Sequence, residues 1–251
     1  MIPLRDDVPS RTVPFVNYAL IVLNSLCFLA EVAMGDQLES FLRVAAVVPA
    51  QFTGPDHILG LGDVVGTLFS PPHQIRILLA MFLHGGLLHL LGNMLYLWIF
   101  GDNVEDRMGH TRYLFFYLLC GWTASYAHIW SNPASRIPSL GASGAIAGVL
   151  AAYLTLYPQA RVVAVVPLVF FFPLIQLPAV VFLGFWFLQQ FLLGTLSLGE
   201  GPAAAGSVAF WAHIGGFLTG LALVRLFARH DRRPTDRDFW WDDHPMRRRG
   251  W

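Results

Sequence analysis

The sequence has no lysine and little charge of either sign. Its 251 residues include 16 arginines and 16 acidic side chains, so the formal net charge is zero and charged residues amount to 13%. Soluble domains typically carry about 25% charged residues, and a mean hydropathy of +0.55 argues against a water-soluble or disordered chain. Eight arginines lie between Arg225 and Arg249 rather than along the body. We therefore expect no nucleic-acid partner.

Cysteine is equally scarce. Cys27 and Cys120 both fall in apolar runs, and the sequence contains no C-x-x-C motif. This spacing predicts neither a disulfide framework nor a cysteine-based zinc site. The two side chains are interpreted as small buried apolar groups.

Long uncharged stretches dominate the chain. A transmembrane helix needs about 20 apolar residues to cross the hydrocarbon layer, and backbone groups in lipid need partners within their own helix. Five uncharged stretches reach 19 to 25 residues: 12–30, 77–101, 113–135, 137–160 and 201–224. These lengths predict an all-α membrane protein with several spans.

A sixth uncharged run is long enough for one span or two. It covers the 38 residues from Val162 to Gly199. Pro167 and Pro173 break helices, so we expect residues 162–177 to form a hydrophobic loop or a shallow interfacial segment. One span from about Pro178 to Leu196 then brings the predicted total to six.

The arginines give an orientation. With six spans and an inner N-terminus, thirteen arginines lie inside and three lie outside, as the positive-inside rule favours. We expect a multi-pass protein of the bacterial plasma membrane with both termini cytoplasmic: residues 1–12 inside, a membrane domain over 13–228 and an Arg-rich tail over 229–251. Residues 36–75 form a long outer loop whose apolar stretches, 44–51 and 64–69, are predicted to lie in the interface.

Three polar clusters stand out inside these spans, where ionisable groups are costly and usually functional. They are His84 to Asn93, Gly141 to Gly148, and Ala212 to Gly220. His89 and Asn93 are four residues apart and so share a helix face. His84 lies five residues before His89, and we expect it to point elsewhere.

Each cluster alone has other interpretations. The histidines can be helix-packing residues, or three of them (His84, His89 and His213) can bind a metal. The glycine patterns are typical of close helix packing, and Ser143 can hydrogen-bond to its own helix backbone.

Together the clusters indicate nucleophilic catalysis. Close approach of spans four and six at their glycines would bring Ser143 near His213. A serine needs a base to remove its proton, and neutral imidazole is suited to this near pH 7. Side chains of His89 and Asn93 can donate to a developing oxyanion.

At these residues the sequence resembles the rhomboid family of intramembrane serine proteases. The motifs are H-x4-H-x3-N at His84, His89 and Asn93; G-x-S-G at Gly141 to Gly144; and A-H-x2-G-x3-G at Ala212 to Gly220. An E-x-R-x-G motif follows the second span at Glu105 and Arg107. Order and spacing fit over most of 76–223.

The resemblance implies a six-helix bundle with an active site that opens to water from the outer face. It implies Ser143 as nucleophile, His213 as general base, and an oxyanion hole of His89, Asn93 and the Ser143 and Ala142 backbone N–H groups. It further implies single-span membrane proteins as substrates, no metal or cofactor, and a lateral gate around Trp186. Residues expected to support the site are His84, Gly141, Gly144, Gly148, Gly216, Gly220, Arg76, Glu105 and Arg107.

Two positions depart from the family pattern. A Trp-Arg pair is common eight residues before the first motif histidine, and here the pair reads Ile75-Arg76. The fourth position after the serine is often aromatic and packs on the catalytic histidine, whereas here it is Ala147. Two alternatives to a protease are a catalytically silent relative that binds membrane proteins and a small transporter. The sequence does not predict an oligomeric state.

Overall fold

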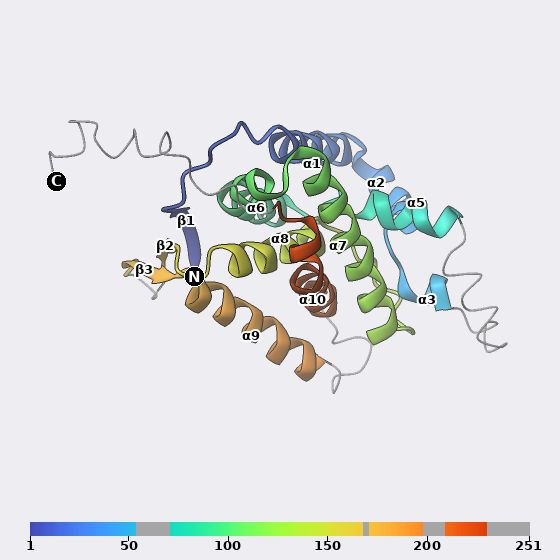
Figure 1. The fold of residues 1–251 in the computed structure, drawn as a ribbon. Helices are drawn as coiled ribbons and strands as arrows, with labels where there is room; N and C mark the ends of the chain where they lie inside the picture. The colour runs from blue at the N-terminus through green and yellow to red at the C-terminus, as the bar shows by residue number, and fades with distance from the viewer. Residues whose placement is uncertain (54–70, 168–170, 198–208, 230–251) are drawn as a thin grey trace, which may run out of the picture.

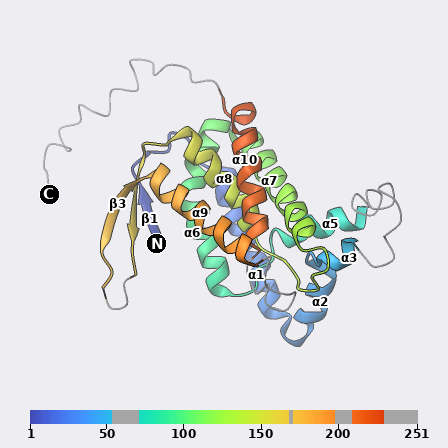
Figure 2. The ribbon, with the colours of Figure 1, turned by 90° about the horizontal axis from the view of Figure 1, so that it is seen from below.

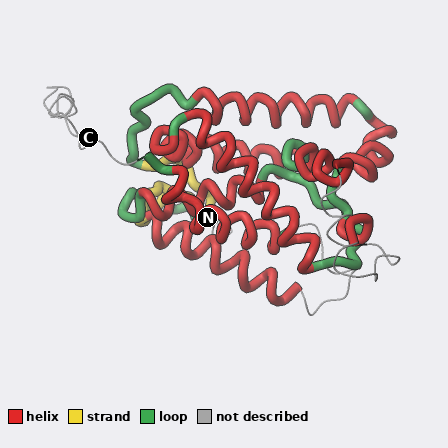
Figure 3. The backbone as a smooth tube through the Cα atoms, turned by 45° about the vertical axis from the view of Figure 1, so that its right-hand side comes forward, coloured by secondary structure: helices red, strands yellow, loops and turns green. Residues whose placement is uncertain are grey.

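The protein is described by a computed structural model over residues 1–53, 71–167, 171–197 and 209–229. Helices make up most of this part of the chain (Figure 3). The helices are α1 (Phe15–Ala33), the 3₁₀ helix η1 (Gly35–Gln37), α2 (Leu38–Ala45), α3 (Pro49–Thr53), α5 (Pro71–Ala80), α6 (Leu87–Met108), α7 (His110–Ser131), α8 (Ser143–Leu156), α9 (Ala179–Ser197) and α10 (Phe210–Phe227). The strands are β1 (Ile2–Asp6), β2 (Arg161–Val165) and β3 (Leu174–Pro178).

Helix α8 lies at the centre of the bundle. It contacts α6, α7, α9 and α10 (Figure 1), and ten of its fourteen residues are buried. Glycine and alanine occupy much of its first half, from Gly144 to Gly148. These small residues let four neighbouring helices approach one short helix closely.

The contact between α8 and α10 is made by backbone against backbone. A Cβ atom at Gly216 would collide with the carbonyl of Gly144, and one at Gly220 would lie 2.7 Å from the Cα atom of Gly148. Lipid tails give apolar helices little reason to associate, so close van der Waals packing of small residues must hold them together. Glycine at these positions is therefore a requirement of the helix crossing.

A small sheet corrects the expectation of an all-α fold. Its order is β1-β2-β3 with antiparallel pairing throughout, so the segment expected as a loop over 162–177 is largely a hairpin. Val162 to Val165 are mostly β-branched and pair with Leu174 to Leu177. The two prolines lie between the strands, where they interrupt no ladder. The sheet lies at the opposite end of the bundle from α2, α3 and α5 (Figure 2).

The N-terminal strand is fastened to the bundle by polar contacts. Asp6 Oδ2 accepts hydrogen bonds from Tyr153 Oη at 2.5 Å and from Asn103 Nδ2 at 3.0 Å. Burial raises the pKa of the Asp6 carboxyl, although the Tyr153 bond opposes the shift. Asp7 Oδ1 also accepts from the backbone N–H of Arg161 at 2.7 Å. Residues 1–7 are thus part of the folded unit.

A buried carboxylate joins α1 to α6 at the same end. Glu105 is fully buried, and its two oxygens accept from the backbone N–H groups of Val16 at 3.0 Å and Asn17 at 2.7 Å. These N–H groups lie in the first turn of α1 and have no acceptor within the helix. A negative charge there also complements the helix dipole. The Glu105 position of the E-x-R-x-G motif therefore has a structural role, far from Ser143 along α6.

At the other end, Arg76 organises the long loop. Its Nη2 donates to the carbonyls of Arg43 at 3.0 Å and Ala46 at 3.2 Å, and also to the Gln51 side chain. The neighbouring Ile75 is exposed, so the loop is held by the arginine without a tryptophan beside it. The loop in turn pairs with the segment before α8, because Val47 and Ser139 exchange two backbone hydrogen bonds.

Three of the described helices are long and apolar enough to cross a membrane, namely α1, α9 and α10. Helix α8 is apolar but has only fourteen residues, and α6 and α7 carry charged side chains within their length. Three of the predicted features lie wholly or largely outside the described residues: the apolar stretch 64–69, the beginning of the window 201–224 and the tail beyond Arg229.

The α8–α10 crossing gives a stability prediction. We expect Gly216→Ala to lower the free energy of unfolding by about 1–3 kcal/mol, because the added methyl group must displace the backbone of α8. The matched control is Gly184→Ala in α9, where a Cβ would have no neighbour within 4 Å; it should be neutral or slightly stabilising. Thermal unfolding of both variants in detergent measures the difference. Equal melting temperatures would contradict the close crossing.

Candidate active site

Ser143 is the first residue of α8, and the chain reaches it through a constrained turn. Gly141 has a φ of +128°, a region that side chains disfavour, and its N–H donates to the Ala80 carbonyl at 2.8 Å. A Cβ at Gly141 would also lie 2.8 Å from the His89 ring. The first glycine of the G-x-S-G motif is thus required by both its backbone conformation and its neighbour.

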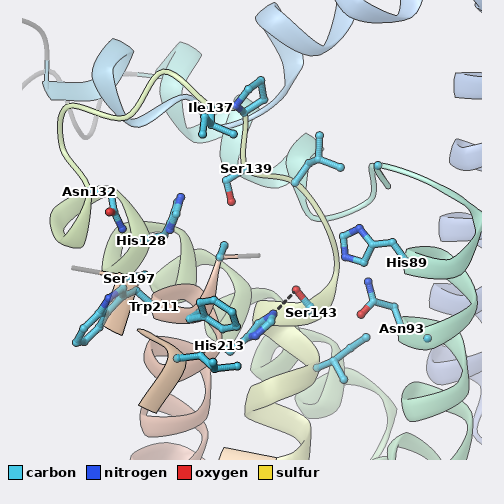
Figure 4. Close-up of a pocket in the computed structure, with 18 of the residues that line it drawn as sticks. His89, Asn93, His128, Asn132, Ile137, Ser139, Ser143, Ser197, Trp211 and His213 are labelled. Atoms are coloured by element: carbon cyan, nitrogen blue, oxygen red, sulfur yellow. Dashed lines mark hydrogen bonds between the residues drawn. The ribbon is translucent and has the colours of Figure 1, made fainter. Parts of the chain in front are cut away.

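His213 meets Ser143 from the facing helix. Its Nε2 lies 2.8 Å from Ser143 Oγ (Figure 4), and both side chains are partly buried. The glycines of the α8–α10 crossing lie just beyond the pair, at Gly144 and Gly216. The close crossing is therefore what brings two residues 70 positions apart into hydrogen-bond contact.

His89 and Asn93 lie one turn apart on α6, across Ser143 from His213 (Figure 4). Asn93 Nδ2 lies 3.0 Å from His84 Nε2. The Ser143 N–H belongs to the first turn of α8 and has no acceptor within that helix, and the fully buried Ala142 precedes it. His89 and Asn93 thus lie on the side of Ser143 that faces away from His213 (Figure 4).

The expectation that His84 points away from His89 is wrong. Their ring centroids are 5.2 Å apart in an edge-to-face arrangement. The expectation assumed one continuous helix, whereas α6 begins at Leu87 after Gly85 and Gly86. His84 lies in the preceding loop and turns back toward the helix. Its backbone N–H donates to both carboxylate oxygens of Glu31, at 3.0 and 3.2 Å, so α1 fixes this loop.

Two residues of α9 contact the other side of His213. Gln190 Oε1 lies 2.7 Å from His213 Nδ1, and the Trp186 ring centroid lies 5.8 Å from the imidazole at an interplanar angle of 38°. Ala147, by contrast, is completely buried. Ala147 thus supplies no ring, and it is α9 that supplies the aromatic side chain beside His213.

A cavity of about 860 Å³ adjoins these side chains. Its lining includes Ser143, His213, His89 and Asn93, and its apolar side chains come from α6, α8, α9, α10 and the segment before α8. Sequence reasoning missed Gln190 on α9 and, on the α7 side of the cavity, His128 and Asn132. The available signal was a polar side chain in a long uncharged stretch, which applies to Gln190 and His128.

Residues 71–230 match the sequence profile of the rhomboid domain.

The chain belongs to the rhomboid family.

Three rhomboid relatives illustrate the likeness. Rhomboid protein 1, mitochondrial, of Saccharomyces cerevisiae is 33% identical over 153 residues, which is 59% of this chain and 40% of that protein. Rhomboid protease GluP of Bacillus subtilis is 38% identical over 102 residues, 41% of this chain and 20% of the relative. The human presenilin-associated rhomboid-like protein, mitochondrial, is 37% identical over 86 residues, 34% of this chain and 23% of the relative.

The chain spans less than half the length of these relatives. The rhomboid match covers α5 to α10 and leaves β1 and α1 outside it. Rhomboid domains are helical membrane domains, and together with the apolar helices this makes the protein an integral membrane protein. Glu105 and Arg76, two motif residues that do not line the cavity, hold α1 and the long loop against this rhomboid bundle.

Proposed function

We propose that the protein is an intramembrane serine endopeptidase that uses Ser143 and His213 as a catalytic dyad. The observation that carries the proposal is the 2.8 Å contact between His213 Nε2 and Ser143 Oγ beside a large cavity in a rhomboid domain. The similarity to a relative named as a rhomboid protease is consistent with it.

In the proposed reaction, His213 Nε2 takes the proton of Ser143 while Oγ attacks the scissile carbonyl carbon. The carbonyl oxygen becomes an oxyanion that the Asn93 and His89 side chains and the Ser143 and Ala142 N–H groups stabilise. His213 then gives its proton to the departing amine, leaving an acyl-enzyme. Water, deprotonated by the same imidazole, releases the acyl group and restores Ser143.

The proposed substrates are single-span membrane proteins. Helical peptide bonds are hydrogen-bonded and inaccessible, so the scissile segment must unwind, and small or helix-breaking residues favour this. Helix α8 is about 21 Å long at 1.5 Å per residue, shorter than the ~30 Å hydrocarbon layer. This supports a serine recessed below the outer surface. Trp186 and the apolar residues of α9 along the cavity support α9 as the lateral gate.

The dyad is tested by substitution in the purified full-length protein. Ser143→Ala should abolish both cleavage of a transmembrane substrate and labelling by a fluorophosphonate. His213→Ala should slow both by about 10²–10⁴-fold, because it removes the general base, and the double variant should be no worse than Ser143→Ala alone. Ser125→Ala, whose hydroxyl bonds to the Gly121 carbonyl in α7, is the control. Cleavage by folded Ser143→Ala would refute the dyad, whereas a folded wild type that neither labels nor cleaves would refute the protease and favour a binding role.

The oxyanion hole gives a second kinetic prediction. Asn93→Ala should lower kcat by up to about 10²-fold and leave KM nearly unchanged, because its hydrogen bond forms mainly in the transition state. Asn93→Asp, of almost the same shape but without the N–H donor, should be similarly impaired. If either variant raises KM at unchanged kcat, Asn93 serves substrate binding instead.

We also propose six spans (α1 and α6 to α10) in a bacterial plasma membrane, with residues 1–12 and 229–251 cytoplasmic and 36–75 outside. The bias of thirteen arginines against three supports this orientation. A reporter fused after Arg249 should remain cytoplasmic, and a tag near Gly54 should react with an impermeant reagent from outside. A reporter on the outer side would mean that the uncharged run 162–199 holds two spans. Ser143 and His213 would then lie toward opposite faces of the membrane, and the proposed mechanism would fail.

A further inference from the structure

Gln190 is a buried amide in an otherwise apolar stretch of α9. It is 8% exposed, while the preceding Gln189 is exposed. Burial of an amide costs free energy unless its polar atoms are hydrogen-bonded. The side-chain oxygen of Gln190 is 2.7 Å from Nδ1 of His213. The partner of this buried amide is thus the imidazole that contacts Ser143.

An acceptor at Nδ1 selects one tautomer of the imidazole. The amide oxygen has no proton to give, so Nδ1 carries the proton and Nε2 keeps its lone pair. Nε2 is the atom 2.8 Å from Ser143 Oγ, and it can receive the hydroxyl proton only while it is unprotonated. The opposite tautomer would donate to Oγ and could not act as the base.

Helix α9 also restricts the plane of the ring. Trp186 lies four residues before Gln190 and therefore on the same helix face, and its ring packs beside the imidazole. Ala147 of α8 is fully buried and presents only a methyl group. Both restraints on His213 described here, a hydrogen bond and an aromatic surface, thus come from α9.

We propose that Gln190 is a positioning residue that orients His213 and holds the tautomer in which Nε2 accepts the Ser143 proton. The proposal rests on the protease function proposed above. It extends the dyad to a third side chain, in the place that a carboxylate occupies in a Ser-His-Asp triad. A neutral amide contributes geometry and tautomer but no charge. Within the described part of the chain, the titratable side chains that act on His213 electrostatically are His89 of α6 and His128 of α7, and neither is acidic.

The test compares three variants of the full-length protein in detergent and in vesicles. Gln190→Leu removes the acceptor at similar volume, Gln190→Glu keeps an acceptor, and Gln189→Leu is the matched control on the exposed face of α9. The rate of fluorophosphonate labelling reports activation of Ser143 without a protein substrate. Gln190→Leu should label about three- to tenfold more slowly, the range for one neutral hydrogen bond, with kcat reduced and KM little changed. Gln189→Leu should label at the wild-type rate.

The glutamate variant separates positioning from simple packing. A carboxylate at Nδ1 favours the imidazolium form and so raises the pKa of the base. The base must be neutral to accept the serine proton. In a plot of labelling rate against pH, the fall in rate on the acidic side (the acid limb) should therefore move to higher pH in Gln190→Glu. Above that limb Gln190→Glu should label at least as fast as wild type, which is rescue by an acceptor that retains the shape of glutamine.

Two results would overturn the positioning role. One is wild-type labelling by Gln190→Leu, and the other is equal loss in Gln190→Leu and Gln190→Glu at every pH. If Gln190→Leu does not fold, the positioning role is also overturned when labelling of Gln190→Glu falls at the same acidic pH as labelling of the wild type. Failure of the protease function looks different, because the wild-type protein itself would then neither label nor cleave.

Discussion

The contact of α8 with α10 determines whether the two reactive side chains meet. Ser143 and His213 are 70 residues apart, and they share a 2.8 Å contact because the helices that carry them cross at backbone distance. Any side chain larger than hydrogen at Gly216 would push the helix axes apart and lengthen that contact. The helices packed around α8 keep this crossing in place. Helix α8 is enclosed by α6, α7 and α9 as well as by α10.

Two buried carboxylates in the amino-terminal half serve backbone groups instead of chemistry. Glu31 accepts from the N–H of His84, and Glu105 accepts from the first turn of α1. Each is costly to bury, but each satisfies N–H donors that a helix or loop end leaves unpaired. Helix α1, outside the rhomboid match, is thereby fixed at both ends to α6 and to the loop before it. The orientation of the histidines near Ser143 therefore depends on a helix that carries no part of the dyad.

The sequence predicted a mostly helical chain, because membrane thickness sets the length of an uncharged run. The stretch 77–101 is nevertheless divided between α5 and α6, and α8 has only fourteen residues. The sequence also predicted that Ser143 and His213 would meet, since glycine spacing on two helices is a local signal of close packing. The sequence did not predict features that depend on contacts between segments distant in the chain. Valine-rich strands pair on either side of two prolines that, by sequence alone, indicate only an interrupted helix. Helix α6 begins three residues after His84. The Gln190 contact could not be predicted, because it depends on which face α9 turns toward α10.

Gln190 lies on α9, the proposed gate, and contacts His213, the proposed base. Trp186 and Gln190 lie one turn apart on the same face of α9, so a displacement of α9 away from α10 withdraws both from His213 at once. The hydrogen bond is worth on the order of 1 kcal/mol, which is too little to prevent such a movement. With α9 displaced, the imidazole would lose its preferred tautomer and its aromatic neighbour together. A substrate admitted past α9 would then meet a poorly oriented base until the helix returned, so chemistry would be favoured only after closure.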